Sequence, residues 1–279
     1  MTTPRHRSIA PRARLRRLPF ARDAAALRLF LDGLYERWNR RGRAHPDPVC
    51  FLHRFADPDD REVAGLAASA LAYGRVAYIM KSVGTALAPL GDRPAQALDA
   101  TASVAEFRRR YNAFSHRWTR GPHVAGLLWA AREVRREHGS LGAAFRAGVE
   151  AGDADYRPAL SLWVRLLRAR DAAAGALLPD PADGSACKRL HLYLRWMVRR
   201  DEIDPGGWDG LSPARLTVPL DTHLHRLARD VLGFTRRGAA DGRAAAEITA
   251  AFARLRPEDP VRYDFALTRW SMSGRTDLP

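Results

Sequence analysis

Two lysines stand out in a chain whose other basic residues are all arginines. The sequence has 46 lysines and arginines, and only Lys81 and Lys188 are lysines. A guanidinium stays protonated near neutral pH, whereas an amine can lose its proton and form a Schiff base with a carbonyl carbon. Lys188 is therefore a candidate nucleophile, while Lys81 lies in an ordinary amphipathic stretch with no evident chemical role.

Lys188 precedes a stripe of apolar residues with helical spacing. Leu190, Tyr193, Leu194 and Met197 define the buried face of a helix that begins near Lys188. At about 100° per residue, Lys188 lies roughly 160° from Leu190, so its amine faces away from the core in the first helical turn. Taken alone, such a lysine is more often a solvated surface charge.

Asp221 occupies the N-cap position of a second predicted helix, which has Leu224, Leu227 and Val231 on its apolar side. Aspartate is a preferred N-cap residue, so capping alone explains its presence. A carboxylate held close to a lysine can also accept the lysine's proton and stabilise a developing positive charge.

The two segments together resemble the helix-hairpin-helix superfamily of DNA glycosylases, through Lys188 and the string Leu-Asp-Thr-His-Leu-His-Arg at 220–226. The resemblance implies that Lys188 is the nucleophile and Asp221 the catalytic carboxylate of a base-excision DNA glycosylase with AP lyase activity. Its substrate is then double-stranded DNA that contains a damaged base. The long interval between the two residues is similar to that of archaeal GO glycosylases, which favours an oxidised purine such as 8-oxoguanine.

The predicted hairpin before Lys188 departs from the superfamily's pattern. The superfamily usually places two glycines there, so that bare backbone amides reach a DNA phosphate, but here only Gly184 is present. Cys50 and Cys187 are the only cysteines, so we expect no iron–sulfur cluster and no other cofactor. The stretches 185–201, 219–229 and 257–267 also resemble an uncharacterised bacterial family. That resemblance extends over nearly all residues from about 25 onward and implies no established substrate.

Further site residues follow from the same resemblance. The side chains or backbone groups expected to contact DNA are Gly184, Ser185, Arg189, His223, Arg226, Tyr73 and Arg75. Within this set, Tyr73 would fill the space left by an extruded base, and Phe265 and Leu192 would line the pocket that receives that base. Ordinary packing is the alternative for Tyr73 and Phe265.

The formal charge of +15 favours a polyanionic partner, because each neutralised phosphate releases condensed counterions. A coding bias that enriches arginine and alanine together is the alternative explanation. The low cysteine content and the absence of a long apolar run predict a soluble protein of the reducing cytoplasm. The DNA substrate that the resemblance implies would associate it with the nucleoid, and we expect a monomer.

Helical periodicity predicts an all-α chain of roughly ten helices. Apolar residues recur at helical spacing within 27–38, 63–71, 76–87, 124–134 and 160–167, and no apolar–polar alternation is evident. We expect residues 1–19 to be a flexible basic arm and residues 20–279 a two-lobed glycosylase-like domain. Its N- and C-terminal helices would share one lobe, with the active site in the cleft between the lobes.

Two other functions are compatible with the sequence. In a DNA-binding module without catalysis, Lys188 would only add charge. In a metal-dependent hydrolase, Asp221, His223 and His225 would hold an ion. The two histidines are two positions apart and point about 200° from each other on a regular helix, so we expect no metal site.

Overall fold

The computed structural model describes residues 17–273, and most of the predicted basic arm lies outside this range. The described chain is mostly helical, which confirms the all-α prediction. Its α-helices are α1 (Ala24–Trp38), α2 (Pro58–Ala70), α3 (Val76–Leu87), α4 (Pro94–Asp99), α5 (Val104–Arg110), α6 (Gly121–His138), α7 (Leu141–Ala147), α8 (Arg157–Arg170), α9 (Lys188–Val198), α10 (Thr222–Arg226), α11 (Gly242–Leu255) and α12 (Asp264–Met272).

Short polar and proline signals start several of these helices. Asp23 accepts hydrogen bonds from two backbone amides at the start of α1, and Asp57 caps α2, whose first residue is Pro58. Such residues satisfy amides that have no partner within the helix, and proline suits the first helical position because it lacks an N–H. The helices predicted around 63–71, 76–87, 124–134 and 160–167 are therefore present as α2, α3, α6 and α8.

One pair of strands was not predicted from the sequence. Strands β1 (Ser115–His116) and β2 (Thr119–Arg120) pair antiparallel, with Ser115 opposite Arg120 and His116 opposite Thr119. Each strand has only two residues, which is too short for an alternating pattern to appear in the sequence. Arg117 turns the chain between them with a φ of 54°, in the left-handed region.

Helix α2 lies at the centre of one group of helices, where it packs against α9, α4 and α6. A Cβ atom at Gly65 of α2 would lie 3.1 Å from Cε2 of Tyr193 on α9, so glycine allows this close approach. Beside them, Trp163, Tyr193 and Trp208 form mutual ring contacts. This packing fixes α9, and with it the position of Lys188.

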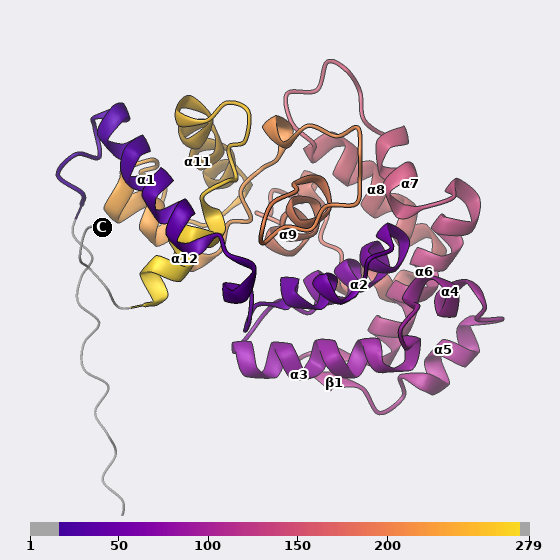
Figure 1. The fold of residues 1–279 in the computed structure, drawn as a ribbon. Coiled ribbons are helices and arrows are strands. Elements are labelled where there is room, and N and C mark those ends of the chain that lie inside the picture. Colours follow the sequence, from indigo (N-terminus) through magenta and orange to yellow (C-terminus); the bar gives the residue numbers. More distant parts are fainter. Residues whose placement is uncertain (1–16, 274–279) are drawn as a thin grey trace, which may run out of the picture.

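The first helix and the last helices of the chain form a second group. α1 packs against α12, and α12 also contacts α10. Figure 1 shows α1, α11 and α12 on one side of the molecule, α3 to α8 on the other, and α9 between them. Beyond α10 the chain continues as a π-helical segment, Leu227–Leu232, whose Leu227, Val231 and Leu232 are buried as their spacing predicts.

No helix within residues 17–273 combines the length and the apolar character needed to cross a membrane.

Candidate functional site

Lys188 is the first residue of α9, and a short loop precedes it. Gly184 adopts a φ of 80°, and the hydroxyl of Ser185 accepts a hydrogen bond from the amide of Cys187 at 3.2 Å. The amide of Gly242, at the start of α11, donates to the carbonyl of Gly184 at 2.9 Å. The predicted hairpin residues thus connect α9 to the second group of helices.

Asp221 is the N-cap of α10, as its position in the sequence predicts. Its Oδ1 accepts hydrogen bonds from the amides of His223 and Leu224, at 2.9 and 2.8 Å. Its Oδ2 lies 3.2 Å from Nζ of Lys188. One carboxylate therefore caps a helix through one oxygen and meets the lysine through the other, so the capping role and a chemical role do not compete.

The Lys188–Asp221 pair is accessible and charged. The two side chains are 33% and 35% exposed, so a substrate can reach them. Burial by itself would raise the pKa of the Asp221 carboxyl, but the positive charge of Lys188 and the hydrogen bond from the Leu224 amide act more strongly together and lower it. Asp221 is therefore a carboxylate near neutral pH, able to stabilise a neighbouring cation.

A row of cations follows Lys188 along one face of α9. Arg195 and Arg199 lie seven and eleven positions further on, close to whole numbers of helical turns. Arg195 pairs with Asp264 of α12 and, at 3.1 Å, with Asp204. These charges are almost fully buried between α9 and the second group of helices.

Arg199 extends the same row. It pairs with Asp204, with Asp201 at 2.8 Å and with Asp259 at 3.0 Å. Burial raises the pKa of the Asp264 carboxyl. The positive charge of Arg195 acts against this rise, and the negative charge of Asp221 adds to it. Asp264 thus lies within electrostatic reach of the Lys188–Asp221 pair. This row was not predicted from the sequence, because its acidic partners come from separate segments.

His223 lies beside the pair, and Arg226 lies on the exposed side of α10. Nε2 of His223 and the hydroxyl of Ser271 on α12 form a hydrogen bond. His225 is buried instead, with its Nε2 3.0 Å from the carbonyl of Arg237. The two histidines therefore have separate partners. Within residues 17–273, no group of three or more histidine, cysteine or acidic side chains is arranged to hold a metal ion.

Tyr73 and Arg189 meet each other, but not in the way the resemblance implies. The hydroxyl of Tyr73 bonds to the carbonyl of His116 at 2.9 Å, and its ring stacks on Trp118. Arg189 donates to the carbonyl of Ala70 at 2.6 Å and lies over both rings. The partners of Arg189 are thus within the protein. The ring of Tyr73, which was predicted to fill the space left by an extruded base, is covered on one face by Trp118. Arg75 is exposed at the start of α3.

Phe265 and Leu192, the residues predicted to line a base pocket, are buried in the core. The guanidinium of Arg269 lies 4.9 Å from the ring of Phe265 and helps to cover it. Core packing, the alternative reading of Phe265, therefore describes its position in this structure. An extruded base would have to displace side chains here in order to be enclosed.

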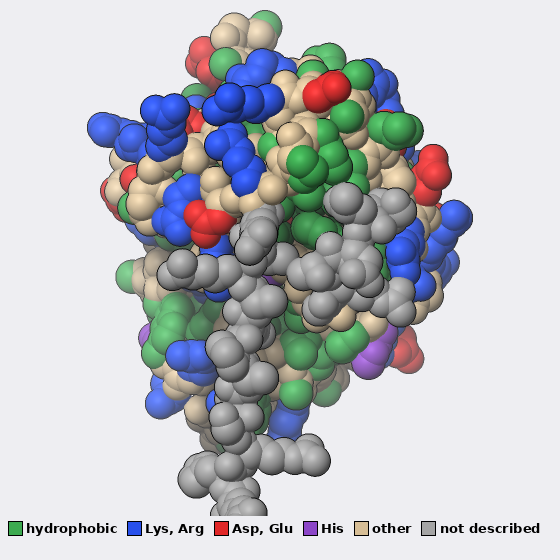
Figure 2. All heavy atoms as spheres, turned by 90° about the vertical axis from the view of Figure 1, so that its left-hand side faces the viewer, with side chains coloured by type: hydrophobic (Ala, Val, Ile, Leu, Met, Phe, Trp, Pro, Cys, Tyr) green, Lys and Arg blue, Asp and Glu red, His purple; other side chains and the backbone are tan. Residues whose placement is uncertain are grey.

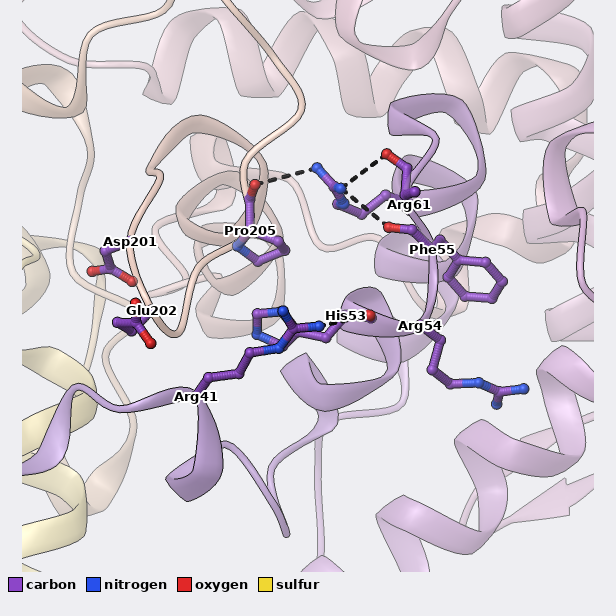
Figure 3. A pocket seen from close by; sticks show the side chains of 9 residues that line it. Arg41, His53, Arg54, Phe55, Arg61, Asp201, Glu202 and Pro205 are labelled. Atoms are coloured by element: carbon purple, nitrogen blue, oxygen red, sulfur yellow. Dashed lines mark hydrogen bonds between the residues drawn. The ribbon is translucent and has the colours of Figure 1, made fainter.

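Three surface hollows of the described residues have linings that do not include the Lys188–Asp221 pair. One of about 440 Å³ lies between the segment 41–61, which includes the start of α2, and the loop that follows α9. Its lining includes the basic and acidic side chains of Arg41, His53, Arg54, Arg61, Asp201 and Glu202. Figure 3 shows Arg61 of α2, whose guanidinium donates to the carbonyls of Phe55 and Pro205. Two others, of about 760 and 560 Å³, adjoin α11 and α8. None of the three is lined by Lys188 or Asp221.

The surface carries many guanidinium groups. Figure 2 shows the side of α1, α11 and α12, where Lys and Arg side chains gather along the upper left of the face. Together with the formal charge of +15, this distribution suits a polyanionic partner.

Comparison with known proteins gives one match. A family model described as "Protein of unknown function (DUF2400)" matches residues 47–273. Neither the curated proteins nor the solved structures contain a significant match to the chain. The matched segment covers most of the sequence and includes both Lys188 and Asp221, and the chain therefore belongs to the DUF2400 family.

Proposed function

We propose that this protein is a base-excision DNA glycosylase with AP lyase activity, with Lys188 as nucleophile and Asp221 as its carboxylate partner. The observation that carries the proposal is the distance of 3.2 Å between Nζ of Lys188 and Oδ2 of Asp221. The two residues are far apart in sequence and begin different helices, and only one other lysine exists in the chain.

The first chemical step breaks the bond between the base and the sugar. Positive charge develops on the sugar as the base departs, and the Asp221 carboxylate stabilises that charge electrostatically. Lys188 rests as an ammonium paired with Asp221, so it must give up a proton before its nitrogen can attack. Asp221 is placed to accept this proton, and the departing base takes up a proton in turn. The amine nitrogen then forms a bond to C1′.

The second step uses the covalent intermediate. Opening of the sugar ring gives an imine between Nζ of Lys188 and C1′. Loss of a proton from C2′ then expels the 3′ phosphate by elimination, which breaks the DNA strand. Water finally hydrolyses the imine and releases the lysine. An arginine at position 188 cannot carry out this sequence, because a guanidinium does not form the imine.

We propose double-stranded DNA with one damaged base as the substrate, and an oxidised purine such as 8-oxoguanine as the base removed. The basic surface supports a DNA ligand, and the choice of base rests on the interval between Lys188 and Asp221. A damaged base is also less costly to extrude from the duplex than an intact one. Nucleoid association and a monomeric state belong to the same proposal.

The arrangement of the helices supports a two-lobed enzyme with its active site between the lobes. Lys188 belongs to α9, which packs on α2, whereas Asp221 caps α10, which packs on α12. In this proposal the α2–α9 group and the group of α1 and α10–α12 are the lobes. DNA lies across their junction, and the ion pairs of Arg195 with Asp264 and of Arg199 with Asp259 fix how they meet.

A panel of duplexes, each with one damaged base, tests the proposal. We expect release of the free base from at least one duplex, and a strand break at the same position without added alkali. An 8-oxoguanine duplex is the first to measure, with undamaged duplex as the control. A protein that binds every duplex but releases no base would be the DNA-binding module, and the proposal would be wrong.

A further inference from the structure

Trp118 is an exposed tryptophan at the tip of the β1–β2 hairpin. Its side chain is 48% exposed, whereas the other six tryptophans of the chain are buried or half-buried. An indole ring is large and mostly apolar, and in soluble proteins such rings are usually covered. The exposure of Trp118 therefore needs an explanation.

The hairpin holds the indole of Trp118 in a fixed place. The ring stacks on Tyr73, with centroids 5.0 Å apart and an angle of 21° between the planes. Tyr73 is held in turn, because its hydroxyl lies 2.7 Å from that of Thr119 and bonds to the carbonyl of His116. His116 is buried and bonds to Ser82 of α3 at 2.8 Å. Trp118 is thus supported from beneath by a connected set of contacts.

The surroundings of Trp118 are positively charged. The guanidinium of Arg189 lies 5.6 Å from the indole centroid, and exposed arginines stand on the hairpin (Arg117 and Arg120) and at the start of α3 (Arg75). Arg120 and Arg189 bond to backbone carbonyls. Within residues 17–273, none of these four arginines forms an ion pair with a carboxylate. The surface around the indole therefore has an excess of positive charge.

The same surface adjoins the candidate active site. Arg189 directly follows Lys188 in α9, and its side chain extends to Tyr73 and Trp118. Figure 1 places β1 beside α3, below α2. The side chain of Arg189 therefore connects the start of α9 with the indole.

We propose that Trp118 is a stacking site for an unpaired nucleobase of a bound DNA strand, with Arg75, Arg117 and Arg120 on the flanking phosphates. A nucleobase has a flat aromatic face and carries a phosphate on each side, so it fits an indole ringed by guanidiniums. This inference rests on the proposed function for its choice of DNA, and it adds a binding site outside the Lys188–Asp221 pair.

Equilibrium binding to two probes tests the inference. One probe is a short single-stranded DNA, and the other is a strand of equal length and charge with a base-free spacer at every position. The full-length wild-type protein should bind the base-containing strand about tenfold more tightly, in the range expected for stacking of one base on an aromatic ring. The same strand should quench the exposed tryptophan fluorescence, while the base-free strand should not.

Three variants make the test specific. Trp118→Leu should lose the preference for bases yet bind the base-free strand as the wild type does, and Trp118→Phe should keep most of the preference. Leu162→Ala removes another exposed apolar side chain, on α8, and should change nothing. An unchanged preference in Trp118→Leu would overturn the inference, as would equal losses for both strands or a wild type without any preference.

The outcome is separable from that of the proposed function, because binding to these strands requires no imine. A preference that depends on Trp118 in a protein that releases no base and forms no covalent adduct would retain the stacking site and refute the glycosylase. A covalent adduct in a protein that shows no preference for bases would retain the proposed function and refute the stacking site.

Discussion

Replacing Asp221 with asparagine separates its two roles. The amide oxygen of asparagine can accept the hydrogen bonds from the His223 and Leu224 amides that Oδ1 accepts now. Asparagine is an N-cap comparable to aspartate, so the start of α10 should be retained. The group that replaces Oδ2 is an uncharged NH₂, which neither neutralises Lys188 nor accepts its proton.

The expected loss of stability in Asp221→Asn is small. Both side chains are about one-third exposed, and an ion pair of this kind contributes about 0–1 kcal/mol. Asp221→Ala loses the cap as well, which costs a further amount of about 0.5–2 kcal/mol. The melting temperature at pH 7 should therefore be highest for the wild type, slightly lower for Asp221→Asn and lowest for Asp221→Ala.

The expected loss of activity in Asp221→Asn is large. Removing one preorganised electrostatic stabiliser slows catalysis on the order of a hundredfold, or about 2.7 kcal/mol. The assay is single-turnover release of the base from a damaged duplex, with folding checked by circular dichroism. A folded Asp221→Asn protein that releases the base within a fewfold of the wild-type rate would refute the reasoning, since Asp221 would then be only a cap.

The pH dependence of stability gives a second test of Asp221. Its pKa in the folded protein is lowered, mainly by Lys188 against the opposing effect of burial. The stability that it contributes is therefore present above its unfolded pKa of about 3.9 and is lost as the pH falls through the folded value. The difference in melting temperature between wild type and Asp221→Asn should accordingly shrink below about pH 4. A difference that grows in acid would contradict the lowered pKa.

Two further predictions concern the buried ion pairs and the basic arm. Arg195→Met leaves the carboxylates of Asp204 and Asp264 buried without this cation, and it should lower the free energy of unfolding in urea by about 3–5 kcal/mol. Arg200→Met removes an exposed ion pair and should lower it by less than about 1 kcal/mol. Equal losses in the two variants would show that the buried ion pairs of Arg195 contribute no more to stability than a surface pair. Deleting residues 1–16, an arginine-rich segment outside the described structure, should make the slope of log affinity for duplex DNA against log salt less steep. An unchanged slope would mean that this segment does not contact DNA.

The positions of Lys188 and Asp221 at the starts of two helices were predictable because the signals for them are local. The apolar stripe of α9 located the start of that helix at Lys188, and the N-cap preference of aspartate placed Asp221 at the start of α10. The distance between them depends on tertiary packing, which periodicity does not supply. The proximity of Lys188 and Asp221 was expected only because of the resemblance to the glycosylase superfamily.

The features that the sequence did not predict all depend on distant contacts. Asp264 follows Arg195 by many residues, and nothing in either segment indicates that they form a buried pair. Trp118 lies in a turn between strands of two residues, too short for a pattern. Phe265 was expected beside a base, but the packing of α12 places it in the core. The longer helices were thus readable from spacing, whereas the exposure of Trp118, the burial of Phe265 and the pairing of Arg195 with Asp264 were not.

Covalent trapping tests the central claim most directly. The protein is incubated with an abasic or damaged duplex and borohydride, which reduces the imine to a stable bond between lysine and DNA. We expect an adduct in the wild type and in Lys81→Arg, none in Lys188→Arg, which keeps the charge but has no amine, and no effect of EDTA. An adduct in Lys188→Arg at nearly the wild-type yield would contradict the account, because another amine would then be the nucleophile.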